Sequence, residues 1–258
     1  MRRALAALGA ALGVLAYWLG IRRSVALEGL ARAFPEKTGE ERRRIARAAY
    51  AQLGRGLMEL VGPPPEVRFP EWEVLTSAKA QGRGVLCAIG HYGNFELLAR
   101  AMSARGERVT IVGRRLRGRF NRWLVERRGI ATLPDRASST QAVAALRRGE
   151  ILGIAVDQNM RPSRGVFVDF FGTPACTTPA AAVYALRAGA PVITVLPVRQ
   201  PDGSHVVHMR GPYTTTGRGH GAVLDLTRQL TRAIEEAVRE HPDHWFWVHR
   251  RWKTRPPG

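Results

Sequence analysis

The sequence predicts an α/β protein with a mostly parallel central sheet flanked by helices. From Gly84 onward, short apolar runs alternate with amphipathic segments that have helical spacing. Strands that alternate with helices are joined by crossovers, which produce a parallel sheet covered on both faces. The hydrophobic fraction of 45% is that of an ordinary folded domain, so intrinsic disorder is excluded as the general state of the chain.

The apolar runs are the predicted strands, and the helices lie between them. We expect strands at 85–89, 109–112, 151–156, 192–198 and 205–209. We expect helices at about 95–105, 120–128, 141–148 and 178–188, and a long C-terminal helix over about 223–238.

A further helix precedes this α/β region. Thr38 and Glu41 have the spacing of a capping box, and apolar residues then recur at helical spacing as far as Leu60. The three prolines at 63–65 end that helix and form a short rigid connector.

The N-terminal segment has the composition of a membrane anchor. Eighteen residues without a charge, Ala4 to Ile21, lie between two arginine pairs. As a helix this segment would be about 27 Å long, close to the roughly 30 Å of a bilayer's hydrocarbon core. Tyr17 and Trp18 suit the headgroup level, and no small-x-small cleavage site follows them. We therefore expect residues 1–23 to be an anchor, spanning or monotopic, rather than a cleaved signal peptide. Arginines on both flanks leave its orientation open.

The net charge restricts the partners. Lys and Arg number 40 against 21 Asp and Glu, a net charge of +19, and only three of the cations are lysines. Such a chain attracts nucleic acid, anionic lipid headgroups or an acidic carrier protein. Nucleic acid is the weakest of these, since the arginines are scattered and the apolar N-terminal segment does not fit that function. Cys87 and Cys176 have no CxxC neighbour, which predicts no disulfide framework and a reducing environment.

The residues from His91 to Glu96 carry the predicted chemistry. Five residues apart on a helix, these two side chains would point about 140° away from each other. If His91 lies in the turn after the first strand, Gly93 bends the chain and Asn94 caps the helix, then Glu96 can reach back to the imidazole. A base with an orienting carboxylate at a strand end is typical of a catalytic site in an α/β sheet. The alternative is a capping histidine with a solvated glutamate.

Motifs along nearly the whole chain, in the right order, carry a resemblance to a known family. They are Leu30–Pro35, Gly90–Glu96, Gly113–Arg115, Asp157–Asn159, Gly165–Gly172 with Ala175 and Thr177, Gly189–Val192, and Trp245–Lys253. The chain resembles the bacterial lipid A late acyltransferases, the lauroyl and myristoyl transferases, which are relatives of the HX4D/E glycerolipid acyltransferases. It departs from their pattern in having Phe95 where tryptophan is usual and in being shorter than many members.

The resemblance implies an acyltransferase domain at 24–258 that moves a fatty-acyl chain from a thioester to a hydroxyl of a lipid A precursor. His91 would be the general base and Glu96 its partner. The predicted substrate-binding residues are Asn94, Arg114, Arg115, Asp157, Gln158 and Arg164. The donor would be acyl carrier protein or acyl-coenzyme A, and no metal or other cofactor is expected. The predicted location is the cell inner membrane, with the catalytic domain facing the cytoplasm.

Other functions stay open at this stage. A lysophospholipid or a glycolipid such as a phosphatidylinositol mannoside would use the same histidine and carboxylate. A non-catalytic lipid-binding protein is the remaining alternative. The histidine pairs at 205 and 208 and at 241 and 244 lack accompanying acidic or cysteine ligands, so we do not expect a metal there. Cys87 lies within a predicted buried strand and is a poor candidate nucleophile.

Overall fold

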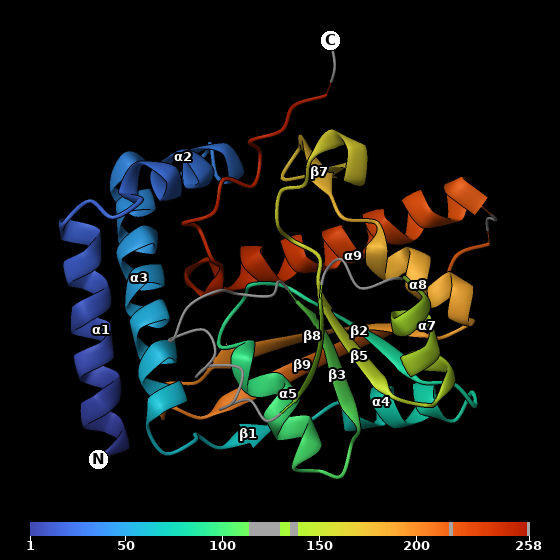
Figure 1. Ribbon diagram of the computed structural model, residues 1–258. Helices are drawn as coiled ribbons and strands as arrows, with labels where there is room; N and C mark the ends of the chain where they lie inside the picture. The colour runs from blue at the N-terminus through green and yellow to red at the C-terminus, as the bar shows by residue number, and fades with distance from the viewer. Residues whose placement is uncertain (114–129, 135–138, 217–218, 257–258) are drawn as a thin grey trace.

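The computed structural model describes residues 1–113, 130–134, 139–216 and 219–256. A twisted sheet forms the centre, helices cover both of its faces, and a group of N-terminal helices stands at one side (Figure 1). The main sheet contains β1 (Val67–Arg68), β2 (Val85–Ile89), β3 (Val109–Gly113), β4 (Ala131–Pro134), β5 (Ile151–Ala155), β8 (Val192–Arg199) and β9 (His205–Tyr213). Their order is β1-β9-β8-β2-β5-β3-β4. The helices are α1 (Arg2–Trp18), α2 (Arg23–Ala33), α3 (Gly39–Val61), α4 (Trp72–Lys79), α5 (Glu96–Ser103), α7 (Ser139–Arg147), α8 (Ala180–Ala188) and α9 (Gly219–Glu240).

The predicted α/β class is confirmed, and the five predicted strands are present. β8, β2, β5, β3 and β4 are parallel, whereas β9 runs antiparallel to β8. A separate antiparallel hairpin of β6 (Val166–Phe170) and β7 (Thr173–Thr177), the short strands β1 and β4, and helix α4 were not predicted. The helix expected at 120–128 lies outside the described residues.

Alternation along β2 explains why the sheet is buried on both sides. Leu86 and Ala88 join the cluster formed with α8 and α9, while Val85 and Cys87 join the one formed with α4 and α5. Successive strand residues point to opposite faces, so a run without polar residues belongs in the middle of a two-sided core.

The N-terminal segment folds differently from the single long helix that its composition predicted. Helix α1 ends at Trp18, and α2 leaves it at an angle of 90°. Among the described residues no single helix is long and apolar enough to cross a bilayer; only this bent pair passes such a test together, on length and composition. The break follows from Gly20 and Arg22, which both adopt positive φ angles of 77° and 54°.

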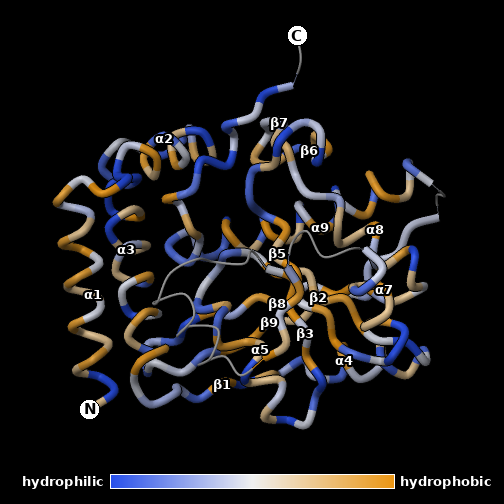
Figure 2. The backbone as a smooth tube through the Cα atoms, viewed as in Figure 1, coloured by the Kyte–Doolittle hydropathy of each residue, from blue (hydrophilic) through white to orange (hydrophobic). Residues whose placement is uncertain are grey.

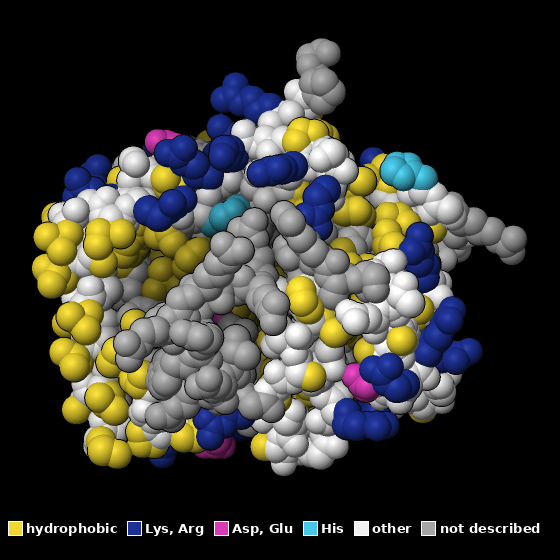
Figure 3. Space-filling view, viewed as in Figure 1, with side chains coloured by type: hydrophobic (Ala, Val, Ile, Leu, Met, Phe, Trp, Pro, Cys, Tyr) yellow, Lys and Arg dark blue, Asp and Glu magenta, His cyan; other side chains and the backbone are white. Residues whose placement is uncertain are grey.

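Helix α1 packs along α3 at backbone distance. A Cβ atom on Gly9 would overlap the carbonyl of Gly54, and one on Gly13 would overlap that of Tyr50. Small residues allow two helices to approach this closely. The opposite side of α1 is apolar and uncovered: much of the α1 tube is orange in Figure 2, and yellow hydrophobic side chains line the left edge of the molecule in Figure 3. Its exposed apolar side chains are Leu8, Leu12, Leu15 and Trp18, with Leu19 and Ile21 following the helix.

The helical capping box was predicted correctly. Thr38 accepts a hydrogen bond from the backbone of Glu41, and the Glu41 carboxylate accepts one from the backbone of Thr38. These reciprocal bonds satisfy the first free N–H groups of α3 and fix where this helix begins.

Candidate active site

The register of the sheet brings His91 and Asp157 together. Ile89 pairs with Ala155, and His91 and Asp157 each lie two residues beyond that pair in the parallel strands β2 and β5. The connection after β2 passes over one face of the sheet through α5, and the connection after β5 passes over the other through α8. Between such strands the carboxyl ends form a crevice, the usual ligand position in an open α/β sheet.

Asp157 holds His91 through two hydrogen bonds. Its Oδ1 lies 2.7 Å from the imidazole Nδ1, and its Oδ2 accepts the backbone N–H of His91 at 2.7 Å. The Trp245 indole N–H also donates to Oδ2, at 2.8 Å. The carboxyl of Asp157 is buried, whereas the His91 side chain keeps 22% of its surface exposed. The imidazole is therefore accessible and the carboxylate is not.

The charges of this pair stabilise each other. Burial lowers the pKa of His91, but the charge and hydrogen bond of Asp157, with a smaller effect from the Glu96 charge, outweigh it and leave the pKa above its ordinary value. Burial would raise the pKa of Asp157, yet the charge and hydrogen bonds of His91 and the bond from Trp245 lower it to about 2. The carboxylate is thus ionised at neutral pH and favours an Nδ1–H tautomer that leaves Nε2 as the basic nitrogen.

Gln158 contacts that basic nitrogen. Its amide Nε2 lies 3.0 Å from Nε2 of His91, so the amide donates to the unprotonated ring nitrogen. The backbone carbonyl of Gln158 accepts a hydrogen bond from the guanidinium of Arg251 at 3.4 Å. Arg251 also donates to the backbone carbonyl of Cys176 at 3.0 Å. Arg251 is almost fully buried, which lowers its pKa to about 10, and it stacks near the Phe170 ring.

Asp157 makes the bond to the imidazole that the sequence assigned to Glu96. Glu96 is the first residue of α5, and both ring nitrogens of His91 are engaged by residues that follow β5. The bend expected at Gly93 is present, with a φ of 54°. Glu96 is five residues along the chain from His91, whereas the pairing of β2 with β5 places Asp157 directly opposite it. The pairing of the strands therefore determines which carboxylate contacts the imidazole. Whether Glu96 takes part in catalysis stays a prediction.

Asn94 does not cap α5 as predicted. The N-cap residue is Phe95, which makes no side-chain capping bond, and the Asn94 amide donates instead to Glu59 at 2.8 Å and to the Gly56 carbonyl at 3.3 Å. Asn94 is buried and faces α3, so contact with substrate stays a prediction that these bonds do not favour.

The other predicted substrate-binding residues differ in their surroundings. Asp157 was predicted to bind substrate; its two carboxylate oxygens are used by His91 and Trp245 within the protein. Arg164 is exposed at the end of a short 3-10 helix, Pro162–Arg164. Arg114 and Arg115 lie outside the described residues.

Sequence reasoning missed the C-terminal contributions to this site. Trp245 and Arg251 lie in the Trp245–Lys253 motif, but their residue types alone gave no indication that they would contact Asp157 and Gln158. His249 is close enough for its titration to respond to Asp157 and His91, while burial lowers its own pKa to about 4. The aromatic side chains Phe170, Phe171 and Trp247 are buried in the core, whereas Phe167 and Phe246 are half-buried.

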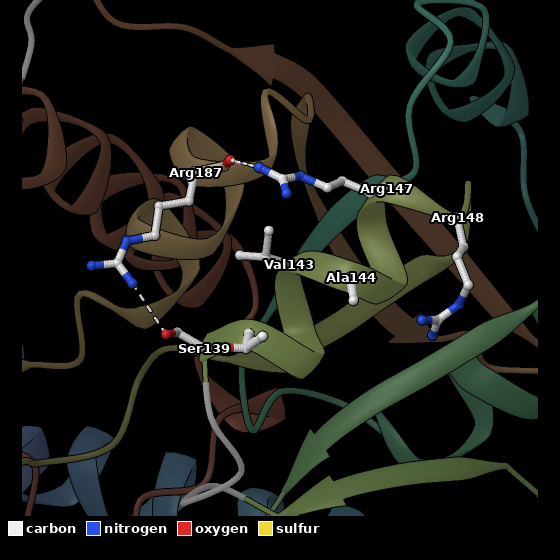
Figure 4. Close-up of a pocket in the computed structure, with 7 residues that line it drawn as sticks. Ser139, Val143, Ala144, Arg147, Arg148 and Arg187 are labelled. Atoms are coloured by element: carbon white, nitrogen blue, oxygen red, sulfur yellow. Dashed lines mark hydrogen bonds between the residues drawn. The ribbon is translucent and has the colours of Figure 1, made fainter.

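An open groove of ≈ 600 Å³ lies on α7 and α8 (Figure 4). Arg147 and Arg187 contribute to its lining, and both are held by hydrogen bonds: Arg187 donates to Ser139 and Arg147 to the Arg187 carbonyl. Neither His91 nor Asp157 lines it. Over the part of the chain that the structure describes, no group of three or more His, Cys, Asp or Glu side chains could hold a metal ion.

A histidine held by a buried carboxylate at the carboxyl edge of a parallel sheet is suited to removing a proton from a hydroxyl group. Comparison with known proteins identifies the family. Residues 2–254 match the family model described as bacterial lipid A biosynthesis acyltransferase. The chain therefore belongs to the bacterial lipid A biosynthesis acyltransferase family, and it is an acyltransferase.

Named relatives cover almost the whole chain. It is 28% identical to the lipid A biosynthesis lauroyltransferase of Escherichia coli K12 over 97% of this chain and 86% of that protein. It is 28% identical to the palmitoleoyltransferase of the same strain, over 97% and 85% of the two chains. A crystal structure of the 1-acyl-sn-glycerophosphate acyltransferase of Thermotoga maritima matches with a TM-score of 0.45 and 14% identity, covering 95% of this chain and 100% of that one.

Proposed function

We propose that this enzyme transfers a fatty-acyl chain from an acyl thioester to a hydroxyl group of a lipid A precursor at a membrane, with His91 as general base. The observation that carries the proposal is the 2.7 Å contact between Nδ1 of His91 and the buried Asp157, in a chain of the lipid A acyltransferase family. That contact leaves Nε2 as the nitrogen that accepts the proton.

The reaction follows from this arrangement. Nε2 of His91 removes the proton from the acceptor hydroxyl as the oxygen attacks the thioester carbonyl carbon. A C–O bond forms, and the carbonyl electrons move onto the oxygen of a tetrahedral intermediate. The C–S bond then breaks, and the thiolate takes the proton from the imidazolium. Asp157 stabilises the imidazolium throughout, since its carboxylate is ionised and in hydrogen-bonding contact.

Gln158 has a defined place in this sequence of events. Its amide occupies the lone pair of Nε2 that the acceptor hydroxyl needs. The hydroxyl therefore displaces this amide when it binds, and the released N–H groups are then free to donate to an oxygen of the substrate. Backbone N–H groups near the start of α5 or an arginine would stabilise the tetrahedral oxyanion, as predicted from the sequence.

The predicted partners remain part of the proposal. Acyl carrier protein or acyl-coenzyme A is the donor, and an anionic lipid is the acceptor. The net charge of +19 supports both, because carrier protein, coenzyme A and lipid A phosphates are all negatively charged. Lys and Arg side chains gather along the upper edge of the molecule in Figure 3, around α2 and the β6–β7 hairpin.

We further propose that α1 lies on the membrane surface rather than across it. One side of α1 is sealed against α3 at Gly9 and Gly13, while the outer side carries Leu8, Leu12 and Leu15, each about half exposed. A helix with one face covered by protein and the other apolar is suited to insertion along the interface. The inner membrane, with the catalytic domain on its cytoplasmic side, is the expected location.

The test is an acylation assay with full-length enzyme in detergent micelles. Acyl carrier protein thioester and acyl-coenzyme A are supplied separately, each with a lipid A precursor, a lysophospholipid or a glycolipid as acceptor, and the lipid products are identified by mass spectrometry. We expect an acylated lipid A precursor and a rate lowered by about a hundredfold or more in His91→Ala. Acylation of a lysophospholipid or a glycolipid instead would reject the acceptor but keep the chemistry. Normal turnover in His91→Ala would reject the base.

A further inference from the structure

A buried ionic cluster lies directly behind the turn that carries His91, Gly93 and Asn94. Its centre is Glu59 of α3, whose side chain is only 9% exposed. The carboxylate forms an ion pair with Arg199 at the end of β8 and lies 3.1 Å from Nε2 of His205 at the start of β9. It also accepts the amide of Asn94, at 2.8 Å. Three segments far apart in the sequence, α3, the turn after β2 and the β8–β9 hairpin, therefore meet at one carboxylate.

The charges of this cluster balance. Burial, together with the charges of Arg199 and His244, lowers the pKa of His205 to about 3, so its imidazole is neutral and donates Nε2–H to Glu59. One carboxylate then faces one guanidinium. Because taking charges out of water is costly, such a pair persists only when its partners are held in place, and removing one partner leaves the other uncompensated.

The cluster is bonded to the turn that carries His91. Asn94 joins it through its amide, and the neighbouring Gly93 donates its N–H to the His244 carbonyl at 2.7 Å. The imidazole of His244 in turn accepts the backbone N–H of Arg199 at 3.1 Å. A Cβ atom at position 93 would overlap the carbonyl of Pro197, so the backbone of this turn lies directly against β8.

Residues that follow α9 hold the same turn from its other side, through backbone contacts like those between two strands. The backbone N–H of Phe246 donates to the His91 carbonyl at 3.0 Å, and Tyr92 bridges to Trp245, the residue that also bonds Asp157. The position of the imidazole relative to Asp157 therefore depends on contacts that converge on Glu59 and on the residues after α9.

We propose that Glu59 is a positioning residue: its buried cluster holds the Gly93–Asn94 turn, and thereby His91, in register with Asp157. The inference rests on the proposed role of His91 as base. Glu59 lies on α3, and α1 packs against the opposite side of that helix. The Glu59 carboxylate therefore links the packed helices α1 and α3 to the turn that carries His91. Nothing in this role requires Glu59 to touch the substrate.

The test compares Glu59→Gln, the charge-balanced double variant Glu59→Gln/Arg199→Gln, and Asn94→Ala, which cuts the link to the turn and leaves the ion pair intact. Glu40→Gln is the matched control, since Glu40 is on the same helix with its side chain 68% exposed. The primary measurement is the titration of the His91 imidazole by NMR in the full-length protein, which does not depend on turnover. Circular dichroism identifies the variants that are folded, and kcat and KM are measured on the same preparations.

In the folded variants we expect the pKa of His91 to fall toward that of an ordinary histidine, because the contact with Asp157 that raises it is loosened. We expect kcat to fall about tenfold or more while KM changes little, since the loss is in the geometry of the base. Glu40→Gln leaves both unchanged. If Glu59→Gln does not fold, the double variant and Asn94→Ala decide.

An unshifted His91 titration in the folded double variant and in folded Asn94→Ala would overturn the proposal. Failure of His91→Ala to lower turnover, with a shifted titration in the Glu59 variants, would instead reject the proposed function and keep the positioning role. The two failures are therefore distinguishable.

Discussion

Helix α3 meets the rest of the molecule in two different ways. Toward α1 it presents Tyr50 and Gly54, and the contact is backbone against backbone. Toward the turn that carries His91 and the end of β8 it presents Gly56 and Glu59, and the contact consists of hydrogen bonds to Asn94 and an ion pair with Arg199. Within each pair the residues are three or four apart and share a face, whereas Gly54 and Gly56 are two apart and point to nearly opposite sides of the helix.

The difference lies in how many arrangements each contact permits. Close apolar packing depends on shape alone, and hydrophobic contacts tolerate small displacements better than a bonded polar group does. A buried carboxylate with three polar partners has one arrangement that satisfies all of them. We infer that α3 is adjustable on the side that packs against α1 and fixed on the side that bonds the turn carrying His91, and the following predictions test this contrast.

The largest expected effect is in Asp157→Asn, because Asp157 is the direct partner of His91 in the turn that the polar side of α3 holds. An amide cannot stabilise the imidazolium, so the rate should fall by a factor of about 10² to 10⁴. Since Asp157 raises the pKa of His91, its loss lowers that pKa. The acidic limb of the kcat/KM profile, which rises as His91 loses its proton, should therefore move to lower pH. The pH dependence of acyl transfer measures both effects.

Asp169→Asn is the control for that experiment, because Asp169 is exposed on the β6–β7 hairpin. A normal rate in Asp157→Asn, or an acidic limb that does not move, would contradict the assignment of Asp157 as the partner of His91.

The sequence could predict the position of His91 but not its partner. A histidine after an apolar run and before a helix is a local pattern, and the strand at 85–89 and the bend at Gly93 are confirmed. The pairing of His91 with Asp157 depends on β2 and β5 being neighbours in a particular register, which is information that no single segment contains. Local reasoning therefore chose Glu96, the nearest carboxylate along the chain.

The same limit applies to Asn94 and to the N-terminal helix. As a capping residue, Asn94 would accept a backbone N–H of α5 through its side-chain oxygen. Its amide N–H instead donates to the buried carboxylate of Glu59, on a helix 35 residues earlier, and this bond directs the side chain toward α3. The apolar composition of α1 was visible, but the 90° break after Trp18 was not, since glycine and arginine at positive φ angles depend on how α2 packs.

On the adjustable side, Leu12→Glu/Leu15→Glu should weaken membrane binding. Each of these leucines is about half exposed on α1, and burying a leucine in lipid contributes about 1.5–3 kcal/mol. The double variant should partition into vesicles of anionic phospholipid about a hundredfold less well. Flotation of the vesicles measures this, and acyl transfer to a micellar substrate should be unchanged because the substitutions are remote from His91.

Leu186→Glu is a suitable control, since Leu186 is an exposed leucine on α8, away from α1. Equal flotation of the wild-type enzyme and the α1 variant would remove α1 from the membrane contact.

The variant Gly54→Val tests the close packing between α1 and α3. The added side chain would overlap the Gly9 backbone, so α1 has to move outward, at an expected cost of about 1–3 kcal/mol in the free energy of unfolding. Urea denaturation followed by circular dichroism measures this. Gly221→Ala on α9 is the control, because nothing lies within 4 Å of its added Cβ and helix propensity favours alanine there. An unchanged stability in Gly54→Val would show that the two helices are not held in contact.

The smallest effect is expected for Glu96→Gln, and this variant separates the two carboxylates that surround His91. Glu96 contributes to the raised pKa of His91 through its charge, after the charge and hydrogen bond of Asp157. Removing only that charge should lower the pKa of His91 less than Asp157→Asn does, and should slow acyl transfer by about tenfold or less. Measured side by side, a larger loss in Asp157→Asn assigns the orienting role to the residue that strand pairing places opposite the imidazole. A larger loss in Glu96→Gln would return that role to the carboxylate within the His91–Glu96 motif, and would mean that the contact with Asp157 serves mainly to hold the backbone of β2 and β5 together.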